Sequence, residues 1–176
     1  MHHEDYLSKK SVFFENVHTH RILADLLVEC VRRTPPVFLD VLRSEVDDNG
    51  IDVVITDGKV TRYIQLKARA KGRLPVKPYQ ISERLLNIPG GCIVWIRYEK
   101  AKLNPVDYFY LGGTPPRAIS GLRDFPKAKN RKGKIRVGYR CIKMSMATRK
   151  RIGLGELADL LFPFRSAHVS RRRRHA

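Results

Sequence analysis

Cysteine is scarce in the sequence, and long apolar runs are missing from it. The three cysteines, Cys30, Cys92 and Cys141, lie far apart and form no CxxC pair. We therefore expect buried, reduced thiols in a cytoplasmic protein, and neither a disulfide framework nor a zinc site. No apolar run approaches the roughly 20 residues that span a bilayer, and the polar start MHHEDYLSKK predicts no signal peptide.

Acidic residues are also few, and the last third of the chain has almost none. The 176 residues include 35 Lys and Arg but only 17 Asp and Glu, which gives a net charge of +18 and a pI near 10.3. Residues 117–176 hold 18 of the basic side chains and 3 of the acidic ones. This imbalance predicts a polyanionic partner, nucleic acid before a membrane surface.

Length and composition predict a single domain over residues 1–165. With 43% hydrophobic residues the chain can bury a core. The nearly neutral first part, at about 11–112, is expected to be the chemical core of the domain. A basic extension follows at 113–165. The arginine-rich end, 166–176, is expected to be disordered.

Hydrophobic periodicity predicts the order of helices and strands. A helix is expected over 11–33, because apolar residues recur there at three- and four-residue steps: Phe13, Val17, Ala24, Leu27 and Val31. Alternating and apolar runs predict strands, and stretches rich in Pro, Gly and cations predict loops. We expect strands at 37–43, 51–56, 60–67, 92–98, 106–113 and 135–144, short helices at 79–87 and 154–162, and loops at 68–78 and 113–134. The result is a mixed α/β domain.

The strands at 51–56 and 60–67 are expected to form a hairpin. A two-residue turn at Asp57-Gly58 would pair residues whose numbers sum to 115, and side chains alternate between the two faces. One face then carries the apolar residues together with Arg62: Ile51, Val53, Ile55, Val60, Arg62, Ile64 and Leu66. The other face brings Asp52, Gln65 and Lys67 to the same end of the hairpin.

These residues resemble the motifs of a nuclease superfamily. The segments GID (50–52) and QLK (65–67), preceded by a helix that bears carboxylates, are similar to the PD-(D/E)xK superfamily, specifically its Mrr-like branch with a QxK third motif. The resemblance covers residues 11–98. It implies a restriction-endonuclease-like αβββαβ core, in which helices flank a central mixed sheet, followed here by a basic C-terminal extension.

The resemblance also implies roles for the matching residues. Asp52 would be the central metal ligand, and the backbone carbonyl of Leu66 would add a second oxygen. Lys67 would orient or help deprotonate the attacking water. Gln65 stands where the commonest pattern has an acid, so its amide oxygen would be a neutral ligand. Oxygen ligands of this kind favour Mg²⁺ or Mn²⁺.

A further carboxylate is expected from the first helix. At 100° per residue, one stripe about 80° wide holds Glu15, His18, Ile22, Asp25 and Glu29. A helix that packs back along the first strand begins near the catalytic end, which favours Glu15 and leaves Asp25 and Glu29 in reserve. His18 and His20 are two residues apart and point to different helix faces, which argues against a zinc pair.

Two functions follow from these patterns. The resemblance implies a metal-dependent endonuclease that hydrolyses phosphodiester bonds in DNA, in a process such as restriction, repair or recombination. The basic charge fits, as the alternative, a non-catalytic nucleic-acid-binding protein that keeps the nuclease-like fold. DNA is favoured over RNA, and a homodimer or a partner protein remains open. The expected nucleic-acid contacts are Arg69, Lys71, Arg73, Lys127, Lys129, Arg131, Lys132, Lys134, Arg171, Arg172, Arg173 and Arg174.

Overall fold

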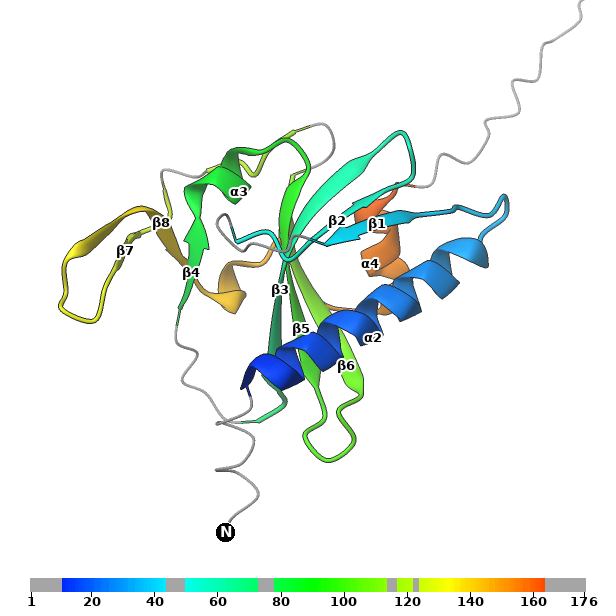
Figure 1. Cartoon of the computed structure of the whole chain (residues 1–176), viewed down its shortest axis with the longest axis horizontal. Coiled ribbons are helices and arrows are strands. Elements are labelled where there is room, and N and C mark those ends of the chain that lie inside the picture. The colour runs from blue at the N-terminus through cyan, green and yellow to red at the C-terminus, as the bar shows by residue number, and fades with distance from the viewer. Residues whose placement is uncertain (1–10, 44–49, 73–77, 114–116, 122–123, 164–176) are drawn as a thin grey trace, which may run out of the picture.

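The fold is built on one central sheet that is covered on both faces (Figure 1). The computed structural model describes residues 11–43, 50–72, 78–113, 117–121 and 124–163. The chain forms these elements in order: α2 (Ser11–Val31), β1 (Asp40–Arg43), β2 (Val53–Thr56), β3 (Thr61–Ala70), β4 (Tyr79–Ser82), α3 (Glu83–Asn87), β5 (Gly91–Tyr98), β6 (Pro105–Gly112), β7 (Lys127–Lys129), β8 (Ile135–Ile142), the 3₁₀ turn η2 (Met144–Met146), β9 (Arg149–Ile152) and α4 (Leu154–Leu161).

Two sheets organise these strands. The central sheet has the order β1-β2-β3-β5-β6-β9, and the smaller sheet has the order β4-β8-β7. Within the central sheet β3 and β5 run parallel and the other neighbours run antiparallel. This arrangement confirms the expected mixed α/β fold with a mixed central sheet flanked by helices.

Each face of the central sheet has its own core. On one face α2 and α4 pack over Val53, Ile55 and Ile64, which form the first core. On the other face α3 and the smaller sheet pack over Ile93 and Trp95, which form the second core. No helix in the described part of the chain has the length and apolar character needed to cross a membrane.

The first helix buries a different stripe from the one expected. Ile22, Leu26 and Cys30 are buried against the sheet, whereas Phe13 is 61% exposed and Val31 is 47% exposed. Ala24 is exposed as well, and Val17 and Leu27 are half-buried. The spacing rule found the helix but not its face, because two overlapping apolar stripes satisfy the same period.

The hairpin between β2 and β3 has a four-residue loop in place of the expected two-residue turn. Thr56 pairs with Thr61 and Val53 with Ile64, so paired numbers sum to 117. The Asp57 carboxylate closes the loop by accepting hydrogen bonds from the backbone amides of Lys59 and Val60. A shift by two residues keeps the alternation of faces, so Gln65 and Lys67 still share a side.

One hairpin residue lies on the other face from the one expected. Ile51 packs with the second core, because the regular strand begins only at Val53 and the chain before it no longer alternates with it. The thiols of Cys30 and Cys92 are buried as expected, but Cys141 is only half-buried.

Several further boundaries were wrong in the sequence analysis. β3 continues to Ala70 into the expected loop at 68–78, and the expected helix at 79–87 begins as strand β4. Strand β7 lies inside the expected loop at 113–134, and β9 was not expected at all. These strands are short and rich in Lys and Arg, so their pairing depends on neighbouring strands and not on their own periodicity.

The basic extension is part of the folded unit and does not stand apart from it. Strand β9 pairs with β6 at the edge of the central sheet, and β8 pairs with β4 in the smaller sheet. Helix α4 contacts α2 and contributes Leu157 and Leu161 to the first core. The last third of the chain therefore supplies part of both hydrophobic cores.

A buried arginine joins these two parts of the chain. Arg62 is 0% exposed, and its guanidinium donates to the backbone carbonyls of Leu161 at 2.7 Å and Gly113 at 2.9 Å, and also to that of Leu160. The carbonyls at the end of α4 have no partner within the helix and carry the negative end of its dipole. Arg62 therefore caps α4 from inside the core.

Replacing Arg62 with Met should destabilise the fold strongly, because the shorter, apolar side chain removes the guanidinium from the carbonyls of Leu160 and Leu161 at the end of α4. We expect a loss of about 3 kcal/mol in the free energy of unfolding, or a drop in Tm of about 6–12 °C. Urea and thermal denaturation measure both quantities. The exposed Arg32 provides the control, Arg32→Met. A loss no larger than that of the control would show that the capping carbonyls do not depend on Arg62.

Candidate active site

Asp52 stands at the open end of the hairpin, one residue before β2 begins and beside the part of β3 that continues past it. Its backbone N–H donates to the carbonyl of Ile64 at 2.9 Å, and its Oδ2 accepts from the backbone N–H of Leu66 at 2.6 Å. The ladder between β2 and β3 stops at Val53, so the side chain of Asp52 takes the place of the next backbone acceptor. This bond fixes the carboxylate beside the residue that separates Gln65 from Lys67.

Gln65 is held in the second core, close to the backbone that leads into Asp52. It is 5% exposed, and within the described structure its Oε1 has no hydrogen-bond partner. Gly50 lies against it with φ of +66°, and a Cβ atom at that position would stand 2.9 Å from Gln65 Nε2. The glycine of the GID segment is therefore needed both for its backbone conformation and for the close approach of the amide.

Lys67 links the sheet to the first turns of α2. Its Nζ lies 3.4 Å from Glu15 Oε1, with 20% of the Lys67 side chain and 46% of the Glu15 side chain exposed. Lys67 pairs with Trp95 of β5 on one side, and the register of β2 on the other side ends three residues earlier, at Ile64. Among the described strands none pairs with this side of β3 past Ile64, and here the lysine reaches the helix.

The other two helix acids lie elsewhere. Asp25 forms an ion pair with Arg21 at 3.1 Å, one turn away on the same helix. Glu29 is near α4, where a Cβ atom at Gly155 would be 3.3 Å from its Oε1. Since 14 residues of helix rise about 21 Å, Glu29 and Glu15 are at opposite ends of α2. The structure places Glu15, and neither of the reserve acids, in contact with Lys67.

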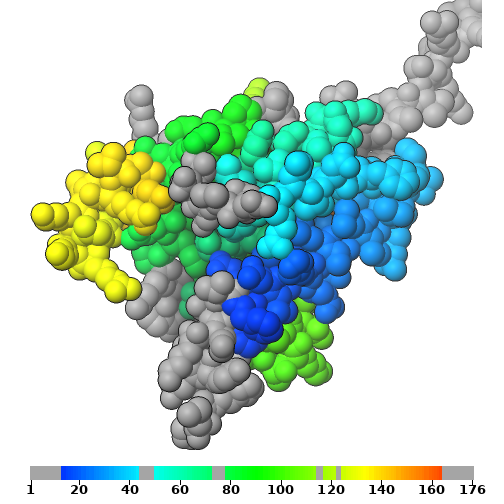
Figure 2. Space-filling model, viewed as in Figure 1, coloured from blue at the N-terminus to red at the C-terminus, as the bar shows by residue number. Residues whose placement is uncertain are grey.

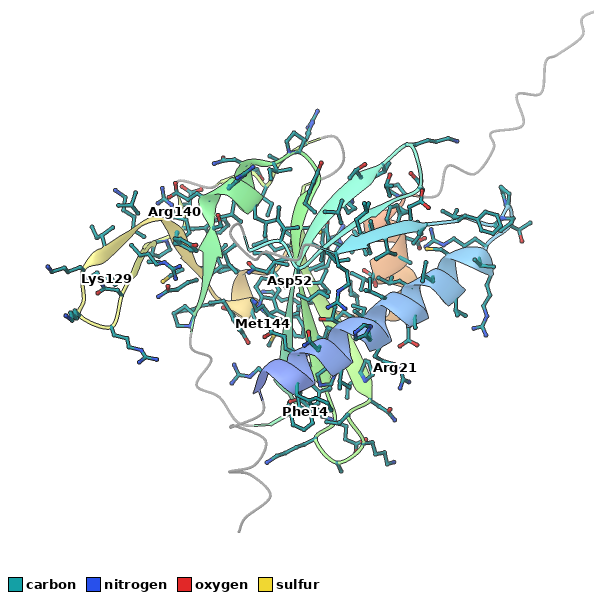
Figure 3. The ribbon with its side chains drawn as sticks, in the orientation of Figure 1. Phe14, Arg21, Asp52, Lys129, Arg140 and Met144 are labelled. Carbon is teal, nitrogen blue, oxygen red and sulfur yellow. The ribbon has the colours of Figure 1, made fainter. Side chains whose placement is uncertain are left out.

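A small cavity opens beside the Glu15–Lys67 pair. Its volume is 210 Å³, and its lining includes two aromatic residues that the sequence analysis did not single out, Tyr79 and Tyr98. Phe14, labelled at the beginning of α2 in Figure 3, also lines it. Tyr79 at the start of β4 and Tyr98 at the end of β5 come together only after the strands have paired, so no local pattern could have identified them.

His18 of α2 also lines this cavity. It is 1% exposed, its ring centroid lies 3.9 Å from that of Tyr98, and neither ring nitrogen has a hydrogen-bond partner in the described structure. Burial lowers the pKa of His18, because the charged imidazolium would lose its hydration. His20 lies on the exposed side and its Nε2 is 3.0 Å from Arg43, so the two histidines are separated as expected.

The donors at this site are oxygens, which suits a hard divalent cation. Asp52 and Glu15 carry carboxylates, and Gln65 carries a neutral amide oxygen, Oε1, that has no hydrogen-bond partner among the described residues. Among the residues that the structure describes, no three His, Cys, Asp or Glu side chains gather closely enough to hold an ion. Oxygen donors of this type are the ones that Mg²⁺ or Mn²⁺ prefers, and this set carries fewer charges than a carboxylate triad would.

The described basic residues that are expected to contact nucleic acid lie in two places. Arg69 is half-buried on β3, and Lys71 is exposed just after it. Five exposed cations lie on or around the hairpin of β7 and β8: Lys127, Lys129, Arg131, Lys132 and Lys134. Arg73 and Arg171 to Arg174 are outside the described residues.

The buried His18 should make the stability of the protein depend on pH. Its pKa is lower in the folded chain than the value near 6.5 of an unfolded chain, so the unfolded state takes up the proton first as the pH falls. Stability should be complete above about pH 6.5 and decrease below it, by up to about 1.4 kcal/mol per pH unit.

Urea unfolding at pH 7.5 and pH 5.0 tests this expectation. His18→Phe should lose less stability between the two pH values than the wild type, because the ring on Tyr98 is kept without a titratable nitrogen. The exposed His20 gives the matched control, and His20→Phe should keep the wild-type dependence. An unchanged pH dependence in His18→Phe would contradict the assignment.

No protein-family model matches the chain, and searches of curated proteins and of solved structures found no match either.

Proposed function

We propose that the protein is a metal-dependent endonuclease that hydrolyses phosphodiester bonds in DNA. One observation carries this proposal: the bond between Asp52 and the backbone amide of Leu66, which fixes a carboxylate beside the residue that lies between Gln65 and Lys67 in the sequence. Besides the structural contacts that Asp52 and Lys67 make, the open end of this hairpin brings together an acid, an amide and an ammonium. That combination supplies the oxygen ligands and the cation that phosphodiester hydrolysis needs.

The order of the core elements supports the resemblance to the PD-(D/E)xK nucleases. Helix α2 precedes three antiparallel strands, β1 to β3, and the parallel strand β5 follows after α3. This gives the αβββαβ order that the resemblance implies, apart from β4, which leaves the central sheet to pair with β8. We propose that the core is restriction-endonuclease-like on this basis.

Each residue of the site would contribute one part of the chemistry. Asp52, Gln65 and Glu15 would hold Mg²⁺ or Mn²⁺, together with the carbonyl of Leu66, and the ion would neutralise charge that builds on the phosphate. Lys67 would hold the attacking water by a hydrogen bond and offset negative charge in the transition state. Glu15, in contact with the Lys67 ammonium, would fix its position.

A second candidate is a nucleic-acid-binding protein that does not cleave. It is favoured by the contact between Lys67 and Glu15, which engages the proposed catalytic cation with a proposed metal ligand. The neutral Gln65 adds to this, because it lowers the negative charge available to hold an ion. The two candidates differ in one observable, namely whether phosphodiester bonds break when a divalent ion is added.

Plasmid DNA incubated with the protein and Mg²⁺ or Mn²⁺ tests the proposal, with EDTA as the control for the metal. Nicking or linearisation should require the metal and should be lost in Asp52→Asn, whose amide can still accept from Leu66 but carries no charge. Lys67→Met should lower the rate by about 10²–10⁴-fold, the range of general acid–base and electrostatic contributions. Asp40→Asn, on β1 opposite the far end of β2, is the matched control and should cleave normally.

The outcomes separate the two candidates. Retarded migration without any cutting, under every metal condition, would support the binding protein. Full cleavage by Asp52→Asn or by Lys67→Met would remove that residue from the proposed site. Unfolding curves of both variants should match the wild type within about 1 kcal/mol, so that a loss of cleavage is not a loss of fold.

Gln65→Glu should tighten metal binding, because it adds a negative charge at an atom that has no hydrogen-bond partner in the described structure. The expected gain in affinity for Mn²⁺ is measurable by titration calorimetry. The rate of cleavage need not rise with it, since a tighter ion does not guarantee a better aligned water. Unchanged affinity would place Gln65 outside the ligand set.

A further inference from the structure

The hairpin of β7 and β8 stands out from the body of the protein as a separate ridge. It lies at the far edge of the smaller sheet and projects away from α2, with Lys129 and Arg140 labelled along it in Figure 3. Figure 2 shows the same segment as a lobe at one side of the molecule. Its reach beyond the sheet makes this hairpin accessible to a large partner.

The hairpin is held in a fixed shape. Asn130 closes its tip, since its Oδ1 accepts from the backbone amides of Lys132 at 2.9 Å and Lys134 at 3.0 Å. Next to the tip, Gln80 of β4 donates to the carbonyl of Lys129 at 2.8 Å and accepts from Arg136 at 2.8 Å. These bonds tie both strands to β4, so a partner would meet a preformed surface.

Charge identifies the kind of partner. Between residues 125 and 155 the chain has eleven Lys and Arg and no Asp or Glu. Those at the tip, Arg131, Lys132 and Lys134, are exposed. A ridge of one sign on a rigid two-stranded ribbon complements the phosphates of a nucleic acid, and the major groove of a duplex admits a ribbon of this width.

The hairpin also displays apolar side chains that charge alone does not explain. Val137 is 89% exposed and Ile135 is 56% exposed, in the middle of this basic segment. The register with β7 shifts between Lys127 and Lys129, and Gly138 has φ of +76°, so β8 bulges at Val137. The bulge turns the valine outward, away from either core.

We propose that the β7–β8 hairpin enters a groove of duplex DNA, with its tip cations on the phosphates and Val137 against the bases and sugars. The inference rests on the proposed function for its choice of nucleic acid and names the part of the protein that holds the duplex. The cations supply salt-dependent binding without sequence information. Val137 adds an apolar contact that salt does not screen, and apolar side chains of DNA-binding proteins make such contacts in both grooves.

Anisotropy of a fluorescein-labelled duplex in EDTA, titrated at several NaCl concentrations, tests the inference on the full chain. Val137→Ala should weaken binding by about five- to ten-fold at every salt concentration, since two methyl groups are lost from the contact. Its plot of log K against log[salt] should run parallel to that of the wild type. Lys132→Ala with Lys134→Ala should flatten the slope by about 0.9 for each lost phosphate contact.

Two controls make the result specific. Val106→Ala, on the 44% exposed valine of β6, should bind as the wild type does. Heparin, a polyanion without a groove of stacked bases, should bind wild type and Val137→Ala equally well. Equal weakening of duplex and heparin binding in Val137→Ala would mean a disturbed hairpin, and would overturn the inference.

The inference would also be overturned if Val137→Ala bound the duplex as tightly as the wild type at all salt concentrations. A wild-type protein that did not bind the duplex at all would overturn it as well. The binding measurements require neither metal nor cleavage, so a failure of the proposed nuclease activity would leave this result standing.

Discussion

The buried guanidinium of Arg62 is the constraint that joins the two parts of the chain. A charge at 0% exposure would cost several kcal/mol without acceptors, and the acceptors come from residues far away in the sequence. The carbonyls of Leu160 and Leu161 lie 98 and 99 positions later, at the end of α4. The hairpin that carries Asp52 is therefore complete only when the last third of the chain has folded onto it. This cap explains why the otherwise apolar face of the β2–β3 hairpin carries an arginine.

The candidate site depends on a difference in strand length. Strand β2 pairs with β3 only as far as Val53 and Ile64, while β3 continues along β5 to Ala70. Past Val53 no described strand pairs with the β2 side of β3, and the backbone N–H of Leu66 donates to Asp52 there. Lys67 also reaches α2 on this side. Had β2 been three residues longer, neither contact could form, because a neighbouring strand would occupy both positions.

The proposed catalytic site and the proposed duplex-binding ridge lie on different sheets that meet through β4. Gln80 of β4 bonds to both strands of the β7–β8 hairpin, while Tyr79 beside it lines the cavity next to Lys67. This shared strand gives the ridge a fixed position relative to the site. A duplex held by the ridge would thus meet the central sheet in a limited range of orientations. Such division between holding and cutting suits an enzyme whose substrate is long and uniformly charged.

The sequence by itself determined the α/β class, the shared side of Gln65 and Lys67, and the concentration of positive charge in the last third. Period-two alternation and composition are local properties, and a register shift of two residues preserves the alternation. Only the tertiary structure decided which stripe of α2 is buried, that Glu15 meets Lys67, and that β9 and α4 complete the core. These depend on segments far apart in the chain. Several strand pairings satisfy the same local pattern. The native one buries Arg62 together with its acceptors and covers both faces of the sheet.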